Sequence, residues 1–170
     1  MALGLGYDGQ DCAVARALEV VGERWTLLIL RDLFLGVRRF SDLQLRLDIS
    51  KGVLSERLNH LVDRGLVART TGTGHAEYEL TEVGIALHPV LVALSSWGRE
   101  YANPEHRPTR ILTHLCGTAL EASGHCPTCD VIAAPADVIS APDPERPGRR
   151  TDPVSVALRR PKRLLEPVAR

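Results

Sequence analysis

The segment from Phe40 to Leu80 reads FSDLQLRLDISKGVLSERLNHLVDRGLVARTTGTGHAEYEL, and its pattern decides the fold. A helix of about two turns begins it, because Ser41 is a good N-cap and Leu43 and Leu47 then share one helical face. Residues 48–49 form a turn that leads into a second, longer helix. This order predicts a helix-turn-helix.

The second helix begins after Ser50, another N-cap, and ends at Gly65, because a residue that tolerates the left-handed conformation favours a helix C-terminus. Its apolar residues recur at steps of three and four and form one face: Val53, Leu54, Leu58, Leu61 and Val62. Its opposite face carries polar side chains: Lys51, Ser55, Glu56, Asn59 and His60. A helix with these two faces can enter the major groove of DNA and present hydrogen-bonding groups to base edges.

A β-hairpin is expected after this helix, with strands at residues 66–68 and 76–80. The tip at residues 70–75 is polar and contains glycine, so it can follow a minor groove or the phosphate backbone. Between Gly36 and His75, seven arginines or lysines stand against four acids, an excess that attracts phosphates. We interpret the whole as a winged helix-turn-helix that binds DNA, although a winged helix can also serve protein contacts alone.

Size and composition exclude several other classes of protein. The chain has 170 residues, 44% of them hydrophobic, which is enough for one domain of about 100 residues and an appendage. The sequence has no apolar run of about 20 residues and no leader-like N-terminus, so we expect a cytoplasmic protein without membrane contact. A formal net charge of zero excludes a polycation that coats DNA. The sequence shows no phosphate-binding loop, nucleophile triad or paired catalytic carboxylates, so we do not expect an enzyme.

Three further helices are expected around the helix-turn-helix. Residues 12–21 form a first helix, residues 23–35 form a buried central helix, and Thr81 caps a long helix that Pro89 bends. The long helix carries an apolar stripe: Val83, Leu87, Val90, Leu91, Leu94, Trp97 and Tyr101. A winged helix this small cannot cover the stripe, so we expect a two-fold homodimer through this helix and the first one. Packing of the stripe within one chain is the alternative.

The C-terminal third contains three of the four cysteines. An H-x-C and a C-x-x-C motif supply residues that zinc prefers as ligands: His114, Cys116, Cys126 and Cys129. We predict a zinc-ribbon-like appendage at residues 107–134, with His125 as an alternative fourth ligand. A redox-active dithiol and a decayed site without metal stay open. Residues 135–170 hold seven of the eleven prolines and predict a flexible tail, and glycine-rich residues 1–10 predict a flexible N-terminus.

The motifs in residues 11–106 resemble those of the HxlR-type winged-helix transcriptional regulators of bacteria, within the MarR-like superfamily. The matching segments are Gly22–Leu33, Gly36–Leu43, Ile49–Ser50, Val53–Leu58, Gly65–Val67, Tyr78–Gly84 and Trp97–Gly98, with Cys12 opening the first helix. The resemblance implies a homodimer that binds double-stranded DNA near promoters, often as a repressor, and that responds to a redox or small-molecule signal. The alternative is a protein-interaction winged helix whose cysteine-bearing appendage is the functional surface.

The resemblance also implies roles for individual residues. It assigns base recognition to Ser50, Lys51, Ser55 and Arg57. It assigns backbone contacts to Arg38, Arg39 and the wing, whose tip includes Thr73 and His75. Gly52 departs from the family pattern, because relatives commonly have a longer polar side chain there. Cys12 lies where some relatives sense oxidants through a reactive thiolate, although a buried, inert cysteine is the alternative.

Overall fold

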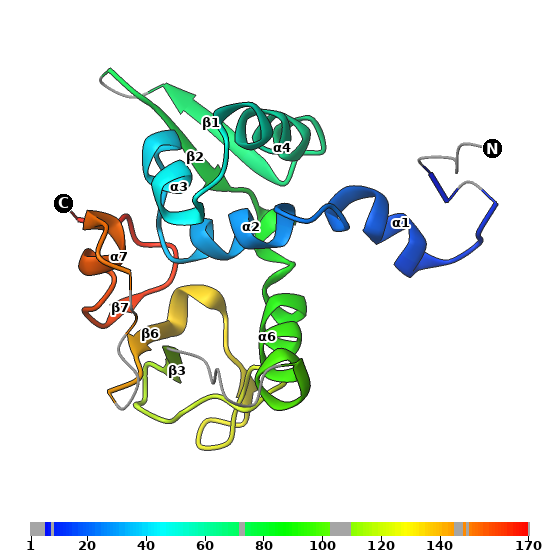
Figure 1. Ribbon diagram of the computed structural model, residues 1–170. Coiled ribbons are helices and arrows are strands. Elements are labelled where there is room, and N and C mark those ends of the chain that lie inside the picture. Colours follow the sequence, from blue (N-terminus) through cyan, green and yellow to red (C-terminus); the bar gives the residue numbers. More distant parts are fainter. Residues whose placement is uncertain are drawn as a thin grey trace.

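The computed structural model describes residues 6–7, 9–71, 74–102, 110–144, 148 and 150–169. Its N-terminal half consists of α1 (Ala13–Val21), α2 (Thr26–Phe34), α3 (Phe40–Leu47), α4 (Lys51–Asp63), β1 (Val67–Thr71) and β2 (Ala76–Leu80), followed by α5 (Glu82–Ile85), α6 (His88–Trp97) and a π-helical turn, η1 (Gly98–Ala102). Strands β1 and β2 form an antiparallel hairpin that lies beside α4 (Figure 1). This arrangement is the expected winged helix-turn-helix.

The helix-turn-helix forms as its capping residues predict. The Ser50 hydroxyl accepts a hydrogen bond from the backbone N–H of Val53 at 3.3 Å, which fixes the start of α4. Asp48 in the turn and Gly65 after α4 both have left-handed backbones, with φ of 53° and 72°. Helix α3 begins at Phe40, one residue before the expected start, with Arg39 at the N-cap.

Helix α2 is the centre of the core, as its apolar composition predicts. Ile29 and Leu30 on α2 are fully buried, and the α4 residues Leu54 and Leu58 pack in the same cluster. Complete burial of one such side chain contributes about 1.5–3 kcal/mol. The inner face of α4 therefore anchors this helix to α2 and leaves its outer face to solvent.

The C-terminal third folds into small antiparallel sheets. Strand β6 (Val138–Pro142) lies between β3 (Arg110–His114) and β7 (Lys162–Arg163), and β4 (His125–Cys126) pairs with β5 (Val131–Ile132). The 3-10 turn η2 (Pro135–Asp137) precedes β6, and α7 (Pro153–Ala157) lies between β6 and β7. Residues 110–144, 148 and 150–169 are called the C-terminal module below. The expected boundary at residues 106–107 lies outside the described residues.

The predictions of a flexible tail at residues 135–170 and of a separate appendage ending at residue 134 are wrong for the described residues. Val138, Leu158 and Leu164 are buried in the core cluster that also contains Leu30 of α2. Pro153 occupies the first turn of α7, where its missing N–H costs nothing, and Asp152 caps that helix. Pro135 likewise begins the 3-10 turn η2, so these two prolines mark the starts of ordered elements.

Backbone hydrogen bonds join the end of the chain to the loop after α2. The N–H of Leu165 donates to the carbonyl of Phe34 at 2.8 Å, and the N–H of Val168 donates to that of Gly36 at 3.0 Å. Gly36 has φ of 78°, and a Cβ at this position would collide with the backbone carbonyl of Glu166. The C-terminal module therefore packs directly against the helix-turn-helix.

The expected long helix after the wing is divided into α5 and α6. Pro89 lies in the first turn of α6, a position that suits proline, so the chain forms a new helix there instead of a bend. Helix α1 begins at Ala13 with Cys12 as its N-cap, and it extends away from the body of the molecule (Figure 1). No helix among the described residues is both long and apolar enough to cross a membrane.

Candidate functional site

A groove between α4 and the wing brings together several residues that the sequence assigns to DNA contact. Its volume is about 570 Å³, and Arg39, Ser55 and His75 contribute to its lining. Sequence reasoning did not select Asn59 and Arg69, which also line the groove. The polar outer face of α4 already contained Asn59, whereas the direction of Arg69 depended on the register of β1.

The outer face of α4 is available to a partner along its first two turns. Lys51 and Ser55 are exposed, and a Cβ at Gly52 would have open space around it. The Ser50 hydroxyl is occupied as the helix cap. Thr73 lies outside the described residues.

Three of the arginines that the sequence assigns to DNA contact form ion pairs with acidic residues of the same chain. Arg38 pairs with Glu79 and also donates to the carbonyl of Leu165 at 2.8 Å. Arg39 Nε lies 3.3 Å from Glu77 Oε1. Arg57 Nη2 lies 3.1 Å from Glu56 and 3.5 Å from Glu23. A phosphate that approached these guanidinium groups would compete with carboxylates, whereas Lys51 makes no ion pair among the described residues.

The predicted metal-ligating residues form a compact cluster at one end of the C-terminal module. His114 ends β3, Cys116 follows in the next turn, Cys126 ends β4, and Cys129 lies in the turn before β5. Their ligand atoms all lie within 4.8 Å of one another, and none of the cysteines forms a disulfide. The Cys116 and Cys126 sulfurs are 3.5 Å apart, close to the sulfur separation of about 3.8 Å that tetrahedral zinc requires. The four residues can therefore hold a metal ion.

The alternative ligand, His125, faces away from the cluster. Its imidazole lies 3.1 Å from Asp130 and 3.4 Å from Glu121. Neighbouring residues in a strand point to opposite faces of the sheet, so His125 and Cys126 cannot both reach the cluster from β4.

Hydrogen bonds within the cluster shift two thiol pKa values in opposite directions. Bonds from the side chain and backbone of Thr118, and then from His114, lower the pKa of Cys116 to about 6. A hydrogen bond with Cys116, together with burial, raises the pKa of Cys129 to about 11. One thiolate therefore forms easily and opposes the ionisation of its neighbour.

Cys12 lies in a different part of the molecule from the cluster. It is the exposed N-cap of α1, and its side chain makes no capping hydrogen bond. In the single chain Cys12 is therefore not buried. Whether the thiol is reactive stays a prediction.

The fold and its exposed helix define a winged helix-turn-helix protein with an additional cysteine-bearing module. Residues 20–106 match the family model described as HxlR-like helix-turn-helix. The chain belongs to this family and is a helix-turn-helix transcriptional regulator.

The similarity to known relatives extends beyond the winged helix. The chain is 43% identical over 142 residues to the uncharacterized HTH-type transcriptional regulator Rv3095 of Mycobacterium tuberculosis, covering 81% of this chain and 89% of the relative. A match of this length continues well past residue 106 into the C-terminal module. The crystal structure of PA1607, a putative transcription factor, has a TM-score of 0.62 and 36% identity, covering 68% of this chain and 84% of that one.

A smaller solved structure matches about half of the chain. The redox regulator HypR in its reduced form has a TM-score of 0.50 and 27% identity, covering 55% of this chain and 95% of that one. The chain is therefore longer than this structure, and the unmatched remainder is comparable in length with the additional C-terminal module.

Proposed function

We propose that the protein is a homodimeric repressor that binds a two-fold site in double-stranded DNA. The observation that carries this proposal is the contrast between the two faces of α4: Leu54, Leu58 and Leu61 are fully buried, whereas Lys51 and Ser55 are exposed beside the wing groove. Helix α4 enters the major groove, and the wing with His75 contacts the adjacent backbone. Arg38, Arg39 and Arg57 exchange their carboxylate partners for phosphates or bases as DNA binds.

Lys51→Ala is expected to weaken binding to the duplex upstream of the protein's own gene about tenfold, because Lys51 is an unpaired cation at the start of the recognition helix. Fluorescence anisotropy at several salt concentrations measures both the affinity and the number of phosphate contacts. Arg64→Ala is the matched control, because Arg64 is an exposed cation at the other end of α4. Equal affinities of the Lys51 and Arg64 variants would contradict this placement of the recognition face.

The proposed dimer interface is the apolar surface of α1, α6 and η1. Its exposed side chains are Val14, Leu18, Val90, Leu94, Trp97 and Tyr101. The rings of Trp97 and Tyr101 lie 6.1 Å apart and are tilted by 41°, so these two side chains form one continuous apolar patch. A second copy of the same helices covers such a patch in a two-fold assembly, and the two α4 helices then read two half-sites.

Trp97→Glu is expected to raise the dimer dissociation constant at least tenfold, because it buries a charge in the centre of the proposed apolar interface. Sedimentation velocity over a range of protein concentrations measures this change. Leu45→Glu is the control, because Leu45 is similarly exposed but lies on α3. A wild-type protein that stays monomeric at micromolar concentration would exclude the proposed dimer.

We also propose that His114, Cys116, Cys126 and Cys129 bind one structural zinc ion. The cluster joins the end of β3 and the turn after it to the β4–β5 hairpin, and only Cys126 among its residues is fully buried. A bound metal would supply the cross-link that so small a pair of sheets lacks in apolar contacts. Separately, the exposed thiol of Cys12 is the proposed site for an oxidant signal.

A further inference from the structure

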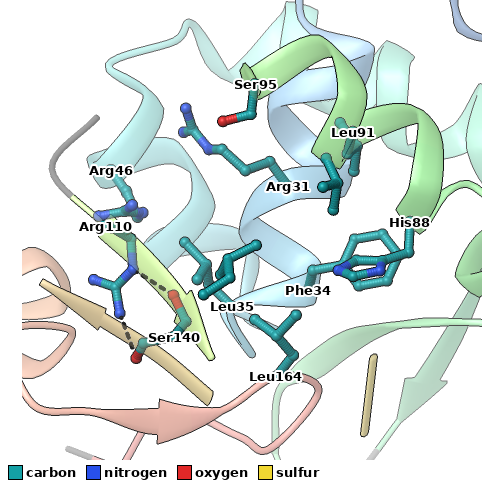
Figure 2. A pocket seen from close by; sticks show the side chains of 12 residues that line it. Arg31, Phe34, Leu35, Arg46, His88, Leu91, Ser95, Arg110, Ser140 and Leu164 are labelled. Atoms are coloured by element: carbon teal, nitrogen blue, oxygen red, sulfur yellow. Dashed lines mark hydrogen bonds between the residues drawn. The ribbon is translucent and has the colours of Figure 1, made fainter. Parts of the chain in front are cut away.

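A cleft lies where the winged helix meets the C-terminal module. Its volume is about 290 Å³, at the small end of the range for ligand sites. Arg31 and Phe34 of α2 form its floor, Leu91 and Ser95 of α6 form one side, and Ser140 of β6 lies on the opposite side (Figure 2). No residue from the proposed DNA-binding groove contributes to its lining.

The lining combines three arginines with no acid among the described residues. Arg31, Arg46 and Arg110 all line the cleft, and Asp32, which pairs with two of them, is fully buried behind it. One carboxylate leaves an excess of two positive charges around a partly desolvated space. Burial, followed by repulsion from Arg46, lowers the pKa of Arg110 to about 10, and this guanidinium is still charged at neutral pH.

Part of this charge has no partner. Arg31 binds Asp32 through Nε and Nη2. Arg46 donates from Nη1 to Ser155, and its buried Nε lies 3.0 Å from Asp32 Oδ2 without the alignment of a hydrogen bond. The Nη1 of Arg31 and the Nη2 of Arg46 make no hydrogen bond among the described residues. Arg110 is held rigidly by Ser140 Oγ at 2.7 Å and by the carbonyl of Leu158 at 2.7 Å. The cleft therefore has two donors that a ligand can engage and a third charge that is fixed in place.

The other part of the cleft is apolar. The ring of Phe34 contacts that of His88, with centroids 5.2 Å apart, and Leu35, Leu91 and Leu164 complete this wall. Burial lowers the pKa of His88, which keeps its imidazole neutral at pH 7. In Figure 2 Leu91, Leu164 and the Phe34–His88 pair lie on the side of the cleft away from Arg46 and Arg110, and Leu35 lies between the two groups.

We propose that this cleft binds a small amphipathic organic anion, a carboxylate joined to one ring or a short apolar chain. The carboxylate accepts hydrogen bonds from Arg31 and Arg46 and lies within the field of Arg110. The apolar body packs on Phe34 and the leucines. The site is distinct from the DNA-binding surface, and its occupation does not require that the proposed DNA binding is correct.

Isothermal titration calorimetry of the full chain without DNA tests this proposal, with 4-phenylbutyrate as the probe and 4-phenylbutanamide as its uncharged match. We expect saturable binding of the acid and at least tenfold weaker binding of the amide. Inorganic phosphate should also bind at least tenfold more weakly than the acid, because it lacks the apolar body.

A pair of variants at Ser95 locates the site. Ser95 is exposed on α6 at the mouth of the cleft, so both variants should fold. Ser95→Asp places a carboxylate beside Arg31 and should weaken binding of the acid at least fivefold. The asparagine in Ser95→Asn has nearly the same shape as aspartate but no charge, so the affinity of this variant for the acid should stay within twofold of that of wild type. Equal affinities for acid and amide, equal affinities for acid and phosphate, no saturable binding of the acid, or equal behaviour of the two variants would each overturn the proposal.

Discussion

Cys126→Ser is expected to remove the metal from the protein and to unfold the part of the C-terminal module around β4 and β5. Wild-type protein purified without chelators should contain about one zinc ion per chain by elemental analysis, and the variant should contain less than about a tenth of that amount. Cys126 is the only fully buried residue of the cluster, and serine is a poor zinc ligand that cannot supply a thiolate. Structural zinc contributes folding free energy directly, so its loss is expected to lower the thermal midpoint by several degrees.

Cys12→Ser is the matched control, because Cys12 is the one cysteine outside the cluster. It should keep its zinc and its thermal midpoint. Wild-type protein treated with a chelator should behave like the Cys126 variant in hydrogen exchange at residues 114–132. If wild-type protein carries no metal and the two serine variants are equally stable, the zinc proposal fails and the cluster is a group of free thiols.

The helix-turn-helix could be predicted because its signals are local. Ser50 and Gly65 lie at the ends of α4, and leucines at helical spacing lie between them. The helix could therefore be predicted without knowledge of long-range contacts. The end of β2 at Leu80 was also predicted correctly, because Thr81 begins a new capping motif. The start of α3, the end of α4 and the extent of β1 differ by one to three residues.

The C-terminal module could not be predicted in the same way. Its buried residues, such as Val138 and Leu164, belong to short apolar runs of two residues among prolines and charges, too short to show a helical or strand period in the sequence. Their partners are distant in the sequence: the bond from Arg38 to Leu165 joins residues 127 positions apart. The composition of this segment resembles that of a flexible tail, and only the tertiary contacts with α2 reveal its order.

The candidate sites also contain features that follow from local sequence and features that depend on long-range contacts. The C-x-x-C spacing was enough to select the cysteines, whereas the choice between His114 and His125 depended on the strand direction at β4. For the proposed DNA-binding surface, the sequence selected Lys51 and Ser55, which are exposed, but it could not show that Arg57 pairs with Glu23 and Glu56. Sequence spacing can select residues of a suitable type, but ion pairs between residues on separate elements can be recognised only once the fold is known.

Asp32 takes part in one of the contacts that connect the helix-turn-helix to the C-terminal module. It is fully buried, and its Oδ1 accepts from Arg31 at 2.9 Å while its Oδ2 lies 3.0 Å from Arg46 Nε, without the alignment of a hydrogen bond. Arg46 belongs to α3 and donates to Ser155 of α7 at 3.0 Å. This chain of contacts runs from α2 through α3 to α7.

Asp32→Asn is expected to lower the free energy of unfolding by about 3 kcal/mol, because it leaves Arg46, which is only 14% exposed, without its counter-charge. Urea denaturation followed by circular dichroism measures this loss. Arg46→Met should cost less, since Asp32 keeps Arg31, and the Asp32→Asn, Arg46→Met double variant should recover at least about 1 kcal/mol relative to the sum of the two single losses. Strict additivity of the two losses would show that the pair is not coupled, and that Arg46 is held by Ser155 and packing alone.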